Sequence, residues 1–92
     1  MRFERAAIPL GGLWSSPFAR WQGELAEQSS LDLVVDVTSR ALERRRFAAA
    51  DLDGIVLGWT VPQPGIFYGA PTVAGRIGAP DITGPMIAQA SA

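Results

Sequence analysis

Residues 51–61, which read DLDGIVLGWTV, set the fold class of the chain. The polar start ending in Gly54 is typical of a turn, and the run IVLGWTV that follows is continuous and rich in β-branched side chains. Such a run is typical of a strand covered on both faces in an α/β sheet. Pro62 follows, and proline ends a strand because it has no N–H to give to the ladder. We therefore expect a central strand over residues 55–61.

The clearest helix signal precedes this strand, over residues 29–46. Ser29 or Ser30 suits the N-cap, and Asp32 stands three residues after Ser29, which resembles a capping box with Asp in place of Glu. The triplet at 44–46 is all arginine and falls in the last turn, where cations suit the helix dipole; a phosphate clamp is the alternative interpretation. One face carries side chains at helical spacing for the core: Leu31, Val34, Val35, Thr38, Ala41 and Leu42.

The rest of the chain adds two strands and a second helix around these elements. Residues 5–10 (RAAIPL) can form a short first strand, and residues 11–28 form a loop ordered by aromatic side chains. After the central strand, residues 62–69 form another loop, a short helix spans roughly 71–77, and 82–90 read as a third strand. The resulting β-α-β-α-β order predicts an α/β fold with parallel strands and right-handed crossovers.

The composition indicates an incomplete domain over residues 1–92. The chain contains neither Cys nor His, which excludes disulfides and metal sites built on those two residue types. With 48% hydrophobic and only 18% charged residues, it is apolar enough to want more partner surface than so short a chain supplies. An obligate partner or a missing remainder is the expected explanation.

The charge and the apolar segments bear on partners and location. A net charge of −1 gives no electrostatic case for binding nucleic acid or an anionic membrane. The N-terminus lacks the apolar run of a signal peptide, and no segment approaches the roughly 18 apolar residues of a membrane span. We expect a soluble, cytoplasmic protein.

Several short motifs occur in a recognisable order along nearly the whole chain. The loop before the long helix reads SPFARWQG, in which Pro17, Arg20 and Gly23 fall in register with a threonine-proline-x-glycine-arginine-phenylalanine-x-glycine segment. The order and spacing of these motifs resemble the thiolase superfamily, in particular its acetyl-CoA acetyltransferase-like members. The later motifs are FYGAP at 67–71, IGAP at 77–80, TGP at 83–85 and AQASA at 88–92.

The resemblance implies a thiolase-like fold in which this chain supplies the first β-α-β-α-β part of the N-terminal domain. It also implies an acyltransferase that works through a covalent acyl-enzyme and Claisen condensation or thiolysis. A coenzyme A thioester is then the substrate, with no covalently bound cofactor and no metal. In the family the nucleophile stands where the third strand turns into a helix, because helix N-terminal amides lower the pKa of a thiol.

Ser91 occupies the position of the family's nucleophilic cysteine, and a serine hydroxyl is poorly ionised at neutral pH without an adjacent base. Three explanations remain open: an engineered replacement, a natural replacement in a divergent member, or a register that is off by one or two residues, with the true cysteine beyond this chain. Ser91 could also simply cap the next helix. The family's histidine and second cysteine are absent, so the resemblance implies that the isolated chain is inactive.

The resemblance therefore implies a companion chain that carries the C-terminal part of the enzyme and completes the acyl-CoA site, in a homodimer or tetramer. Self-cleavage before a Thr, Ser or Cys, a split gene and a truncation all explain a chain that stops after Ala92. The alternative function is a non-catalytic thiolase-like subunit that binds acyl-CoA or stabilises a partner. A third possibility, an unrelated small α/β interaction protein, predicts a stable folded monomer.

Two arginines and four aromatic residues are secondary candidates. Arg20 and Arg76 could contact the coenzyme's phosphates, although structural pairing is the simpler interpretation of both. The aromatic side chains suit core or dimer-contact positions. They are Trp14, Trp21, Phe67 and Tyr68.

Overall fold

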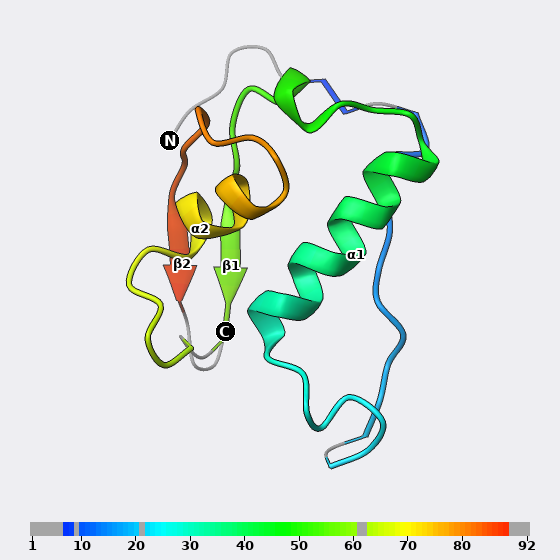
Figure 1. The fold of residues 1–92 in the computed structure, drawn as a ribbon, viewed down its shortest axis with the longest axis vertical. Coiled ribbons are helices and arrows are strands. Elements are labelled where there is room, and N and C mark those ends of the chain that lie inside the picture. Colours follow the sequence, from blue (N-terminus) through cyan, green and yellow to red (C-terminus); the bar gives the residue numbers. More distant parts are fainter. Residues whose placement is uncertain (1–6, 9, 21, 61–62, 89–92) are drawn as a thin grey trace.

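The computed structural model of the chain describes residues 7–8, 10–20, 22–60 and 63–88. Within them the chain is a small mixed α/β arrangement with two α-helices and a two-stranded parallel sheet (Figure 1). The two helices pack against each other, and the second helix lies against the sheet. In chain order the elements are α1 (Ser30–Arg44), the 3-10 helix η1 (Ala49–Asp51), β1 (Leu57–Trp59), α2 (Gly69–Arg76) and β2 (Met86–Ala88).

The two strands form the parallel pair that the sequence predicts, joined by a crossover through α2. Leu57 faces Met86 across the ladder, and Trp59 faces Ala88. Both strands are shorter than predicted: β1 covers three residues of the range 55–61, and β2 begins four residues after the predicted start at Ile82. Each strand has one neighbour to pair with, because the described residues form no third strand on either side of the sheet.

The predicted first strand over residues 5–10 is wrong where it can be judged. Ala7, Ile8 and Leu10 lie in no strand, and the other residues of that range fall outside the described residues. Ile8 is 77% exposed and Leu10 is fully exposed, so neither side chain gains the burial that would hold a strand against the sheet.

The start of α1 agrees closely with the sequence pattern. Ser29 is the N-cap, and its Oγ accepts a hydrogen bond from the backbone N–H of Asp32 at 3.0 Å. The reciprocal hydrogen bond of a capping box, from the Ser29 N–H to the Asp32 carboxylate, is not formed among the described residues. The Asp32 carboxylate instead accepts a hydrogen bond from Arg76 of α2. The cap residue therefore fixes the helix start, while Asp32 ties α1 to α2.

The end of α1 is a Schellman turn, which the arginine triplet at 44–46 did not predict. The N–H of Arg46 bonds the carbonyl of Glu43, and the N–H of Phe47 bonds that of Leu42, both at 3.0 Å. This turn requires a left-handed residue, and Arg46 takes that conformation with φ of 53°. α2 ends in the same way at Gly78, whose φ is 95°. The predicted limit at residue 46 therefore overran the helix by two residues.

The core lies between the two helices and one face of the sheet. Its buried members are Leu31 and Val35 of α1 and Val73 of α2. The same face of the predicted helix was expected to be apolar, and Ala41 and Leu42 are buried as well. Partly buried side chains complete the cluster: Val34, Ile55, Leu57, Trp59, Ile66 and Ile77.

The sheet is covered on one face only, contrary to the expectation for residues 55–61. A Cβ added to Gly69 of α2 would meet the side chains of Leu57, Trp59 and Met86, which identifies the inner face. Successive strand residues point to opposite faces, so Ile87 of β2 belongs to the outer one, as does Val56, which directly precedes β1 and alternates with Leu57. Val56 is 52% exposed and Ile87 is 51% exposed. The hydrophobic run was correctly recognised as a strand, but its second face has no cover within the described chain.

Candidate functional site

The carboxyl edge of the sheet is the place where the sequence predicts chemistry. β1 and β2 run in the same direction, so both strands finish at this edge, at Trp59 and Ala88 (Figure 1). Ser91, the predicted nucleophile position, follows Ala88 by three residues and lies outside the described residues. The structure therefore describes the strand that leads to Ser91 and not Ser91 itself.

α2 begins directly against the inner side of the two strands. The Gly69 N–H, the first of the helix, points to Met86 Sδ at 3.2 Å. A Cβ at Gly69 would stand 2.5 Å from Leu57 Cδ2, so only glycine permits this approach without a shift of that side chain. The sequence predicted the helix start near Pro71, whereas the helix begins two residues earlier because Gly69 can pack against the sheet.

Trp59 gives the inner face of the carboxyl edge an unusual polar atom. Its indole Nε1 is buried and has no hydrogen-bond partner among the described residues. Buried donors without a partner are uncommon, since each forfeits its hydrogen bond to water. The indole N–H at the end of β1 is thus a buried donor without a hydrogen-bond partner among the described residues.

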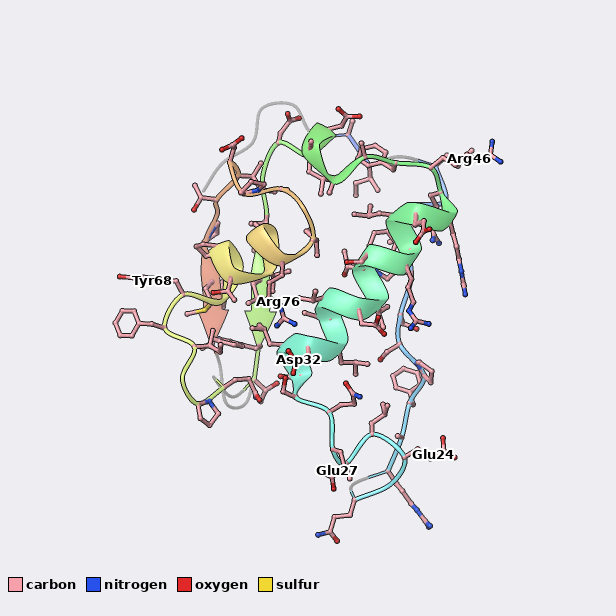
Figure 2. The ribbon with its side chains drawn as sticks, in the orientation of Figure 1. Glu24, Glu27, Asp32, Arg46, Tyr68 and Arg76 are labelled. Atoms are coloured by element: carbon pink, nitrogen blue, oxygen red, sulfur yellow. The ribbon has the colours of Figure 1, made fainter. Side chains whose placement is uncertain are left out.

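Arg76 serves as a structural partner. Its guanidinium donates to Asp32 Oδ1 at 2.7 Å, joining the last turn of α2 to the first turn of α1 (Figure 2). The hydrogen bond from Arg76 lowers the pKa of Asp32 below its ordinary value, and the hydrogen bond with Ser29 adds to the effect. Both side chains of the pair are about half exposed, at 46% for Arg76 and 57% for Asp32, so the pairing is at the surface.

The other secondary candidates lie on the surface. Arg20 is exposed, and its carbonyl accepts the N–H of Gly23 at 2.9 Å in a tight turn. Phe67 and Tyr68 meet edge to face, with ring centroids 4.7 Å apart, and are 79% and 64% exposed. A core role is therefore wrong for both rings within this chain, and a dimer contact stays a prediction. Trp21 lies outside the described residues.

Arg45 is a contact residue that sequence reasoning missed. Its guanidinium donates to the carbonyls of Gly11 at 2.7 Å and Leu13 at 3.1 Å, and also to that of Ala41 within α1. The same group stands 5.1 Å from the ring centroid of Trp14. Arg45 therefore fastens the segment before α1 onto the helix. A solvated helix end was the expected role of the triplet, and neither charge nor periodicity distinguishes the arginine that turns inward.

Comparisons of the chain with known proteins found no relative. No family model matches the chain, and neither the curated proteins nor the solved structures include a match. Among the described residues, no group of three or more acidic, His or Cys side chains could hold a metal ion. None of the described helices has the length and apolar character needed to cross a bilayer.

Proposed function

We propose that this chain is part of a thiolase-type acyltransferase and supplies the strand that leads to its nucleophile. The observation that carries the proposal is the parallel pairing of β1 with β2 through α2. In open α/β sheets, ligands bind beyond the carboxyl ends of the strands. The position after β2 is the one that the family motifs assign to the nucleophile.

The proposed reaction begins when the side chain at position 91 attacks the thioester carbonyl of an acyl-CoA. The acyl group then sits on that side chain, and the coenzyme leaves as a thiol after it takes a proton. A second acyl-CoA, deprotonated at its α-carbon by a base of the companion chain, attacks the acyl-enzyme and releases the 3-ketoacyl product. The Ser91 hydroxyl needs such a base for the first step as well, because it is poorly ionised at neutral pH.

The outer face of the sheet, which no described residue covers, supports the proposal of a companion chain. Parallel sheets occur almost only with both faces covered, because a buried ladder of this kind needs apolar layers on each side. Val56 and Ile87 are each about half exposed there, and Phe67 and Tyr68 are exposed on the loop that follows β1. We infer that a companion chain covers the outer face and brings the missing His and Cys residues.

A second candidate is favoured by one residue. Serine at position 91 fits a thiolase-like subunit that binds acyl-CoA or stabilises its partner without chemistry. The two functions differ in the activity of the assembled protein and not in the fold of this chain.

The first experiment is denaturing intact-mass spectrometry of the native material, followed by a thiolysis assay of the same sample with a 3-ketoacyl-CoA and free coenzyme A. We expect a second, longer chain and acyl transfer that Ser91→Cys raises and Ser91→Ala abolishes. Activity that is the same in both variants would remove Ser91 from the reaction. An inactive assembly that still binds acyl-CoA would establish the non-catalytic subunit, and a single species of this chain alone would end the acyltransferase proposal.

A further inference from the structure

A groove runs between α1 and the segment that precedes it. It encloses about 630 Å³ and is walled on one side by residues 14–17 and on the other by α1. This volume falls in the range of about 300–1,000 Å³ that is typical of small-ligand sites. The groove is built by α1 and not by the strands, so it is separate from the carboxyl edge of the sheet.

The groove is positively charged although the chain as a whole is not. Its walls carry Arg40, Arg44 and Arg45 against the single carboxylate of Asp36, whereas the net charge of the chain is −1. Arg45 is committed to backbone carbonyls, and the Arg40 Nε donates to Asp36 Oδ1 at 3.1 Å. The Arg44 side chain, one helical turn beyond that of Arg40, makes no hydrogen bond or ion pair with any other described residue, so its guanidinium group can bind an anion.

The remaining lining has two further chemistries. Ser15 and Ser16 stand across from the arginines and bring two hydroxyl groups. Trp14, which is 39% exposed, and the half-buried Leu33 and Val37 supply aromatic and aliphatic surface along the same groove. A ligand that matches this lining has both an anionic group and a flat or apolar body.

We propose that this groove binds a small organic phosphate with an aromatic body, of the nucleotide class. The guanidinium groups of Arg44 and Arg40 pair with the phosphate oxygens, since arginine matches phosphate geometry with parallel N–H donors. The base lies against Trp14 and the apolar side chains of α1, because every base offers a π-face to an aromatic ring. The proposal rests on different residues from the acyltransferase proposal, which concerns the carboxyl edge of the sheet.

The test is isothermal titration calorimetry, in which ADP, adenosine and inorganic phosphate are titrated separately into the purified protein. The protein is used with any companion chain it retains. We expect saturable binding of ADP, weaker binding of both fragments, and a loss of about tenfold in ADP affinity in Arg44→Gln. Arg46→Gln is the matched control, because it removes the same charge from a neighbouring, exposed residue that does not line the groove (Figure 2).

Each other outcome overturns the proposal. An equal loss of ADP affinity in the Arg44 and Arg46 variants would mean that ADP is held by general charge attraction and not by the groove. Adenosine that binds as tightly as ADP would remove the phosphate from recognition, and no saturable binding at millimolar ADP would remove the site. Circular dichroism of both arginine variants verifies that α1 is intact. Ser16→Ala, which keeps all charges, is a second variant, and we expect it to lower the affinity for ADP and not that for adenosine.

Discussion

At the scale of the residue, backbone conformation decides more than side-chain type at the ends of both helices. The same Schellman turn closes α1 at Arg46 and α2 at Gly78, and both residues have a positive φ. The left-handed conformation costs a residue with a Cβ about 1 kcal/mol, whereas glycine adopts it freely. Arg46 is therefore a site where the sequence departs from the local optimum.

We predict that Arg46→Gly stabilises the protein, while Arg44→Gly, two residues earlier at the end of α1, destabilises it. Relief of the strained φ at Arg46 gains about 1 kcal/mol, and the larger chain entropy of glycine takes back roughly half of that gain. Glycine costs up to about 1 kcal/mol within a helix, and Arg44 is the last residue of α1. The free energies of unfolding of the two variants in urea should thus differ by up to about 1.5 kcal/mol, and equal destabilisation would show that the turn at Arg46 is not formed.

The limits of sequence reasoning are also clear at this scale. Ser29 was recognisable as an N-cap because capping depends on neighbours three residues away. The role of Arg45 was not recognisable, since its acceptors on Gly11 and Leu13 lie more than 30 residues earlier in the chain. Local patterns reveal local contacts, and the inward turn of one arginine among three depends on the tertiary fold.

At the scale of the element, the helix with a periodic apolar pattern was predicted well, and the lengths of the strands, which lack such a pattern, were predicted poorly. α1 was located to within two residues because its apolar spacing repeats over several turns. The strands were recognised in kind and direction, but β1 pairs only at Leu57–Trp59, because pairing requires a neighbouring strand and the described chain offers one. The predicted nucleophile position, Ser91, stays a prediction from the resemblance alone.

The joint between the two helices gives a prediction on pH. Arg76 lowers the pKa of Asp32, so the folded protein holds this carboxylate charged where the unfolded chain begins to protonate it. The contribution of the pair to stability is present above the ordinary value of 3.8 and is lost as the pH falls through the lowered pKa. Stability should therefore decline from about pH 4 downward, and less steeply in Asp32→Asn.

The measurement is the free energy of unfolding in urea between neutral and acid pH. Arg76→Gln should also flatten the acid decline, but less than Asp32→Asn, because the hydrogen bond with Ser29 still lowers the pKa of Asp32 in that variant. The double variant should flatten the decline no further than Asp32→Asn alone. A decline of unchanged slope in both single variants would mean that the pair is not formed in solution.

At the scale of the whole molecule, the outstanding feature is a sheet that is packed on one side. The helices cover the face of Leu57, Trp59 and Met86, while no described residue covers the face of Val56 and Ile87, which are each about half exposed. A two-stranded sheet is marginal without further strands or a cover, so the outer face is the place where the proposed companion chain would stabilise this one.

We predict that Val56→Lys leaves the helical circular dichroism of this chain unchanged and abolishes binding of the proposed companion chain. Lysine is tolerated on an exposed face, but an ammonium buried under a companion without a partner costs several kcal/mol, enough to weaken the assembly on the order of a hundredfold. Leu13→Lys is the control, because Leu13 is 83% exposed and lies beside α1, away from the sheet. Size-exclusion chromatography with mass detection distinguishes the outcomes: retention of the companion in the Val56 variant would place the interface elsewhere, and its loss in both variants would mean that the companion responds to charge and not to the outer face of the sheet.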